Sequence, residues 1–324
     1  MSGVIDGGVI DVHAHWLPPE LFDLPPGAPY GPMRDRDGEL YLGEIPLSIE
    51  TRAMSDVRAI HDDMRAGGVG VRVLSAPPFA FPVAGPATGY VTAYNEALGA
   101  LVADAGGTLA GLGMVSFDDP AETSAQLESL AAAPGIAGAA IPPLVAGASL
   151  DRGALLHVLT EAERLGLAVL VHPMQLPRPE WGDHYLANLI GNPVETATAV
   201  AALLLGGVKE RLPRLRICFV HGGGCAPGLL GRWEHGWRTR ADVRRSSARP
   251  PRETFRELYF DTVTHDAGQL RLLAAHAGAD AVVCGSDYPF DMAQQDPVGF
   301  ATGAGLDAEA LTGNARTFLH GDGS

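Results

Sequence analysis

Short apolar, β-branched runs recur along the chain, and a helix-like stretch follows each of them. This alternation limits the possible folds more than any other feature, because strands that alternate with helices form parallel sheets through right-handed crossovers. The expected strands are residues 8–13, 69–75, 109–116, 136–142, 167–172, 215–221, 258–263 and 280–285.

Eight helix-like segments lie between and after these runs. They cover residues 52–66, 90–105, 119–133, 150–165, 192–211, 226–240, 266–277 and 306–319. Eight strand–helix units predict an α/β fold of the (β/α)₈ TIM-barrel type, and an open doubly wound sheet is the structural alternative. We expect residues 1–324 to form one domain, because this length is common for a single barrel and no linker interrupts it.

Two long segments interrupt the alternation. Residues 16–50 follow the first strand and are rich in proline and glycine, and residues 173–191 follow the fifth strand. Both leave the carboxyl ends of strands, where barrels place their active sites. We therefore expect both to be binding loops or lids.

Polar residues end several of the expected strands. His13 and His15 end the first, His172 ends the fifth and His221 ends the sixth, while Asp287 follows the eighth. Side chains two residues apart share one face of a strand, so His13 and His15 could hold one ion, although such a pair is often incidental. Because strand ends converge in a barrel, the full set predicts a divalent metal site.

The composition excludes several other classes of protein. A formal net charge of −15 argues against nucleic acid or an anionic membrane as the main partner. The three cysteines form no disulfide framework and no metal-binding pair. The first residues show no signal-peptide pattern, and no apolar stretch is long enough to span a bilayer, so we expect a cytoplasmic protein.

Several sequence stretches resemble the amidohydrolase superfamily. The stretches are "DVHAHWLP", "VHP", "GSDYPF" and the long segment that begins "NPVETATAV" and ends "HGGGCAPGLLGRWEHG". Within that superfamily the chain is similar to the branch of 2-amino-3-carboxymuconate-6-semialdehyde decarboxylase, whose members are mostly non-oxidative decarboxylases. The similarity is strongest from about residue 192 to residue 290 and weak over residues 16–50.

The resemblance implies a role for each residue at the strand ends. His13, His15, His172 and Asp287 would be the ligands of one divalent ion, most simply Zn²⁺, with Mn²⁺ as the alternative. His221 would act as general base toward the metal-bound water, which a metal brings to a near-neutral pKa.

The resemblance also implies one metal ion and a homodimer. Binuclear relatives bridge two ions with a carbamylated lysine at a strand end, whereas Lys209, the chain's one lysine, lies on a helix before the sixth strand. Two arginines of the decarboxylase hold substrate carboxylates, and Arg232 and Arg52 stand nearest to them here. Arg232 would reach the site of the neighbouring subunit. Arginine suits a bidentate grip on a carboxylate.

Several further residues are expected to contact a substrate. Trp16 follows the first strand, and His265 lies in the loop after the seventh. Met174, Tyr185 and Asn188 stand where the decarboxylase is rich in tryptophan. We expect the substrate to differ for that reason.

Three functions are compatible with this site. The first is decarboxylation of an unsaturated or aromatic carboxylic acid, with His221 handling the proton. The second is hydrolysis or hydration of an amide, lactone or conjugated acid by the same metal and base, which the metal site alone does not distinguish from the first. The third is a metal-bearing scaffold, against which an intact His221 beside a full ligand set argues.

Overall fold

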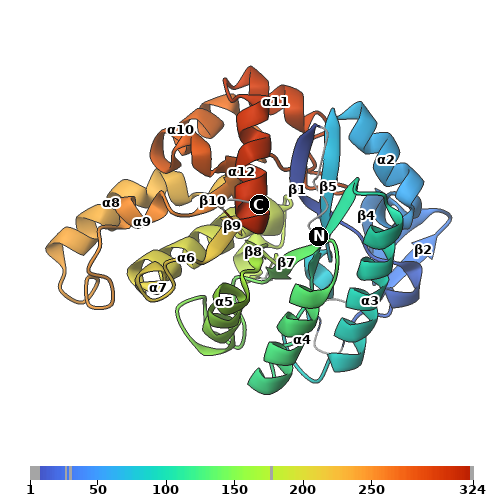
Figure 1. Cartoon of the computed structure of the whole chain (residues 1–324), viewed down its shortest axis with the longest axis horizontal. Coiled ribbons are helices and arrows are strands. Elements are labelled where there is room, and N and C mark those ends of the chain that lie inside the picture. Colours follow the sequence, from blue (N-terminus) through green and yellow to red (C-terminus); the bar gives the residue numbers. More distant parts are fainter. Residues whose placement is uncertain (1–7, 26–27, 29–30, 176–177, 322–324) are drawn as a thin grey trace.

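We analysed a computed structural model that describes residues 8–25, 28, 31–175 and 178–321. Eight parallel strands form one sheet, and the helices surround it (Figure 1). In sheet order the strands are β1 (Val9–His15), β5 (Val69–Ser75), β6 (Leu109–Gly113), β7 (Ile136–Ile141), β8 (Ala168–Val171), β9 (Arg216–Phe219), β10 (Tyr259–Asp261) and β11 (Val282–Val283).

The sheet closes on itself between its first and last strands. Asp11 of β1 forms a parallel bridge with Cys284, and the N–H of Val12 donates to the Cys284 carbonyl at 2.9 Å. The predicted (β/α)₈ barrel is thereby confirmed, and the open doubly wound sheet is excluded. Each expected strand is present, and the later strands are shorter than their apolar runs.

The helices occupy the predicted places. They are α1 (Thr51–Ser55), α2 (Val57–Ala66), α3 (Thr88–Asp104), α4 (Pro120–Ala132), α5 (Gly153–Leu165), α6 (Asn192–Leu205), α7 (Val208–Arg211), α8 (Ala226–Thr239), α9 (Pro251–Phe255), α10 (Ala267–Ala277), α11 (Pro297–Gly303) and α12 (Ala308–His320). Short helical turns are η1 (Pro19–Leu21), η2 (Pro78–Ala80), η3 (Pro179–Trp181), η4 (Ala187–Gly191), η5 (His221–Gly223) and η6 (Ala279–Ala281).

Two expected helices are each divided in the structure. The segment 52–66 breaks at Asp56, which has extended backbone angles and caps α2 by accepting a hydrogen bond from the N–H of Arg58. The segment 192–211 breaks at Gly207, whose φ of 65° is left-handed and ends the regular helix. The short helices α9 and α11 were not expected from the sequence.

The segment 16–50, expected to be a loop, instead contains an antiparallel sheet of β2 (Met33–Arg36), β3 (Glu39–Leu42) and β4 (Ile45–Glu50). Asp37 and Gly38 turn the chain between β2 and β3 with φ values of 56° and 90°. Such left-handed pairs match the twist of hairpin strands. The other insertion, 173–191, holds η3 and η4, and residues 26–27, 29–30 and 176–177 of the two insertions lie outside the described residues.

Helix α12 covers the end of the barrel at which the strands begin, so a site can form at the carboxyl end. The Arg216 side chain, at the start of β9, donates from Nε to the Phe318 carbonyl of α12 at 2.8 Å. Helix α12 therefore lies across the amino ends of the strands (Figure 1). No helix in the described part of the chain has both the length and the apolar character needed to cross a membrane.

Candidate metal centre and active site

Three histidines and one aspartate meet at the carboxyl end of the barrel. His13 and His15 lie on β1, His172 follows β8, and Asp287 lies in the turn after β11. The Nε2 atoms of His13 and His15 are each 3.1 Å from Asp287 Oδ1, and that of His172 is 3.7 Å away. One ligand atom from each of the four buried residues lies within 4.8 Å of the others.

A hydrogen bond donated by Nδ1 orients each imidazole. The acceptor is Asp261 Oδ2 for His13 at 2.6 Å, the Ala76 carbonyl for His15 at 3.2 Å, and the Pro173 carbonyl for His172 at 2.6 Å. These bonds favour the tautomer whose Nε2 lone pair faces the centre. The Nε2 atoms of His13 and His172 are buried without a hydrogen-bond partner among the described residues. This donor set fits a divalent ion.

The electrostatics of the cluster also favour a cation. Burial lowers the pKa of His15, and it lowers the pKa of His172 to about 3, so both rings are neutral. Burial lowers the pKa of His13 as well, but Asp287 and Asp261 outweigh it and raise that pKa to about 10. A positive charge at His13 between two carboxylates is thus favoured, and a bound metal would take over that role.

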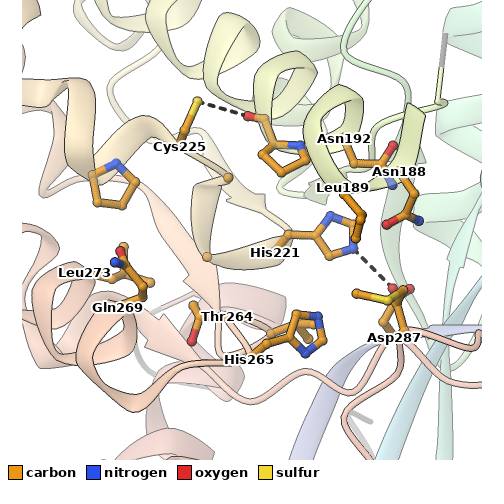
Figure 2. Close-up of a pocket in the computed structure, with 16 residues that line it drawn as sticks. Asn188, Leu189, Asn192, His221, Cys225, Thr264, His265, Gln269, Leu273 and Asp287 are labelled. Atoms are coloured by element: carbon orange, nitrogen blue, oxygen red, sulfur yellow. Dashed lines mark hydrogen bonds and ion pairs between the residues drawn. The ribbon is translucent and has the colours of Figure 1, made fainter. Parts of the chain in front are cut away.

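His221 stands next to this cluster. Its Nε2 lies 3.2 Å from Asp287 Oδ2, the carboxylate oxygen that does not face the Nε2 atoms of His13 and His15 (Figure 2). Its Nδ1 is buried without a hydrogen-bond partner among the described residues. Asp287 thus joins the metal cluster to an imidazole that lies outside it.

Two cavities open beside Asp287. The base cavity, of about 360 Å³, is bounded by His221, Thr264, His265 and Gln269 (Figure 2). The hairpin cavity, of about 390 Å³, lies between residues 42–48 of the β3–β4 hairpin and the side chains of Phe79, Met174 and Phe290. Asn188, Asn192 and Asp287 line both.

Unusual backbone angles gather around these cavities. Nine non-glycine residues of the described chain have positive φ, and six of them line a cavity: Ser48, Gln175, Tyr185, His221, His265 and Asp287. Such angles are costly and are concentrated at functional sites. Their distribution supports the carboxyl end of the barrel as the location of the functional site.

The structure brings only some of the expected substrate contacts to the cavities. Met174, Tyr185 and Asn188 line the hairpin cavity, and His265 lines the base cavity. Trp16 lines neither, since it is buried against Tyr94 and donates its indole N–H to the Ser55 carbonyl at 3.2 Å.

The two arginines expected to hold carboxylates also lie outside both cavities. Arg52 borders a separate surface hollow that it shares with Asp35, Asp37 and Glu50, and it pairs with Glu50 at 3.2 Å. Arg232 is exposed on α8. A carboxylate contact by Arg232 in the site of a second subunit stays a prediction.

Lys209 is remote from the metal cluster, as expected. Its ammonium group donates to the carbonyls of Pro213, at 3.1 Å, and Leu215, at 2.7 Å. Leu215 directly precedes β9, so this lysine lies at the end of the barrel opposite the cluster.

Sequence reasoning missed several supporting residues. Asp261 ends β10 and accepts the His13 bond, and its other oxygen accepts from the N–H groups of Gly222, at 2.8 Å, and Val263, at 3.1 Å. The sequence does hint at Asp261, because a carboxylate is unusual inside an otherwise apolar strand. Asn192, whose amide oxygen is buried without a partner among the described residues, lay in a segment read only as a helix start.

A family described as Amidohydrolase matches residues 10–320 of the chain. A curated relative from Dictyostelium discoideum, 2-amino-3-carboxymuconate-6-semialdehyde decarboxylase, is 30% identical over 302 residues, which is 89% of this chain and 83% of the relative.

Solved structures share the fold. The IDCase of Metarhizium anisopliae in its apo form superposes with a TM-score of 0.83 at 22% identity, covering 97% of both chains. The 5-carboxyvanillate decarboxylase of Novosphingobium aromaticivorans superposes with a TM-score of 0.81 at 17% identity, covering 98% of this chain and 97% of that one. The latter was solved with manganese and 4-hydroxy-3-methoxy-5-nitrobenzoic acid.

Proposed function

Since the chain belongs to the amidohydrolase family, in the branch of 2-amino-3-carboxymuconate-6-semialdehyde decarboxylase, we propose that it is a metal-dependent non-oxidative decarboxylase. Its substrate is an unsaturated or aromatic carboxylic acid. The observation that carries this proposal is the convergence of three imidazole nitrogens and one carboxylate beside a further histidine, at the open end of a barrel.

The four converging residues, His13, His15, His172 and Asp287, would hold the metal. Three nitrogens and one oxygen suit Zn²⁺, and Mn²⁺ is the alternative, since a structural neighbour was solved with manganese. A divalent ion held there supplies positive charge that stabilises negative charge on oxygens of the substrate.

His221 and Asp287 would handle the proton. Decarboxylation replaces a carbon–carbon bond with a carbon–hydrogen bond, so a proton must reach the carbon that loses carbon dioxide. The His221 ring borders the base cavity, and its Nε2 lies 3.2 Å from Asp287 Oδ2. An imidazole in this position is suited to hold and transfer that proton.

A homodimer and a cytoplasmic location complete the proposal. The dimer is supported by the family resemblance and by the exposure of Arg232 on α8. The location is supported by the three free cysteines, two of which are buried.

A product assay tests the function. Metal-loaded protein and a chelator-treated control are offered aromatic and unsaturated acids, together with amides and lactones, and mass spectrometry follows the products. Metal-dependent release of carbon dioxide is the expected result. Metal-dependent gain of water without carbon dioxide would instead establish a hydrolase or hydratase and overturn the decarboxylase assignment.

A further inference from the structure

Asn192, the first residue of α6, lies at the boundary between the two cavities beside the metal cluster. It lines both the base cavity and the hairpin cavity, as Asp287 of the metal cluster does (Figure 2). The base cavity also borders His221, and the hairpin cavity also borders His172. An acid whose carboxylate lies at the metal therefore extends past this boundary, whichever cavity receives the rest of the molecule.

The carboxamide of Asn192 is buried and lacks a partner. The residue is 7% exposed, and its Oδ1 has no hydrogen-bond partner among the described residues. Burying an unpaired amide is unfavourable, and native proteins pair nearly all such groups. Unpartnered buried nitrogens of His13, His172 and His221 lie in the same site. The Asn192 amide thus belongs to a group of polar atoms whose partners come from outside the chain.

The start of α6 is anchored, so this amide has a defined position. The Asn192 carbonyl accepts a hydrogen bond from the Thr196 hydroxyl at 2.9 Å. The Pro193 carbonyl accepts from the N–H of Cys225 at 3.3 Å, in the chain that follows His221. These backbone contacts fix Asn192 relative to His221 and leave its side chain available to a ligand.

A hydroxyl group matches this amide. A carboxamide has one acceptor atom and one donor group, and a hydroxyl can pair with either because it both donates and accepts. We propose that the Asn192 carboxamide binds a hydroxyl group of the substrate and is thereby a specificity-determining residue that selects hydroxylated acids. This inference rests on the proposed function, in that the reacting carboxylate is placed at the metal.

Matched pairs of acids test the inference. The ortho, meta and para isomers of hydroxybenzoate are each compared with the methylbenzoate that is substituted at the same position, because hydroxyl and methyl groups are similar in size. Calorimetry with Mn²⁺-loaded protein measures each dissociation constant without requiring turnover. We expect at least one hydroxybenzoate to bind at least about fivefold more tightly than its methyl counterpart, which is the contribution of one hydrogen bond.

Variants of Asn192 then test the residue. Asn192→Leu removes both polar atoms and keeps a branched side chain, and Asn192→Ala is the second variant should the leucine variant fail to fold. Either is expected to lower the preference for that hydroxybenzoate at least about fivefold, whereas any preference that comes from the metal would remain.

Thr198→Ala is the control on the same helix. Thr198 is exposed, its hydroxyl donates to the Val194 carbonyl at 2.7 Å, and it lies outside the lining of both cavities. We expect this variant to keep the preference of the unmodified protein within about twofold, since it alters no group that faces a ligand.

The outcomes separate this inference from the proposed function. Absence of any hydroxyl preference in the unmodified protein overturns the inference, as does an unchanged preference in a folded Asn192 variant. Equal weakening of the hydroxy and methyl acids also overturns it, because Asn192 would then act on the carboxylate or on Arg232 of a second subunit. Failure of every acid to bind overturns it too, because cavities of about 360 and 390 Å³ admit molecules of this size. The expected preference without carbon dioxide release from any acid would overturn only the decarboxylase assignment.

Discussion

Replacing Asp261 with asparagine tests how the metal cluster is organised. Asp261 Oδ1 accepts from two backbone N–H groups, of Gly222 and Val263, and Oδ2 accepts from His13 Nδ1 at 2.6 Å. Burial alone would raise the pKa of Asp261, but the hydrogen bond and charge of His13 hold it below its usual value. The carboxylate is therefore ionised and fixes the proton of His13 on Nδ1.

Asparagine has nearly the same shape but only one acceptor oxygen. If that oxygen keeps the two backbone bonds, its NH₂ group faces His13 Nδ1, and the ring must move its proton to Nε2, where the metal binds. The loss of a buried charge-assisted hydrogen bond and the wrong tautomer together cost about 2–3 kcal/mol of metal-binding free energy. We expect roughly 30- to 150-fold weaker binding, which overlaps the upper part of the usual range of about 10- to 100-fold for such supporting carboxylates.

The assay is a competition for Mn²⁺ or Zn²⁺ between the metal-stripped protein and a chelator of known affinity. Asp119→Asn is the control, because Asp119 is an exposed helix cap on α4 and contacts no member of the cluster. Thermal unfolding of each stripped protein checks that the variants are folded. Metal binding by Asp261→Asn within about threefold of the unmodified protein would refute this account of His13.

Three further predictions concern the base, the lysine and the metal. His221→Ala should lower the rate of carbon dioxide release at least about 100-fold while bound metal, measured by atomic spectroscopy, stays the same; loss of the metal would contradict its role as base. Lys209→Met should leave one metal per chain and reduce the free energy of unfolding by about 1–3 kcal/mol in urea titrations, because it leaves two carbonyls unpaired. Metal at about 100 times its dissociation constant should raise the free energy of unfolding by about 2.7 kcal/mol over a sample treated with chelator. Equal urea midpoints with and without the metal would contradict a metal site that forms in the folded protein.

The features predicted from the sequence are those that local patterns determine. Buried parallel strands are short and almost wholly apolar, so the eight runs were visible, and the polar residues at the ends of several runs stood out against them. His172 and His221 directly follow such runs, and for this reason the candidate site could be assembled before the fold was known.

The features that were missed depend on backbone angles or on distant partners. The break at Gly207 needs a left-handed conformation that one glycine permits but does not require. Asp37 and Gly38 carried a hairpin signal that the surrounding prolines and glycines obscured. Asp261 and Asn192 were overlooked because their importance comes from His13 and from the cavities, each far away in the sequence.

The seam of the barrel, where β1 pairs with the chain after β11, also explains how Asp287 can contact both the metal cluster and His221. Its φ of 62° is left-handed, which costs a non-glycine residue about 1–3 kcal/mol. The turn is held by hydrogen bonds across the seam: Asp287 N donates to the His13 carbonyl at 2.8 Å, and Ser286 Oγ donates to Asp11 Oδ2 at 2.6 Å.

A buried arginine completes this support. Arg72 donates to Asp11 at 2.9 Å, and its guanidinium lies 4.6 Å from the centroid of the Tyr288 ring. It therefore contacts Tyr288, which follows Asp287, and the carboxylate that binds Ser286, which precedes Asp287. The same contacts join the first strand to the chain that follows the last. Because barrel closure and the position of the shared carboxylate depend on one set of hydrogen bonds, a change that loosens the seam should weaken metal binding before it unfolds the barrel.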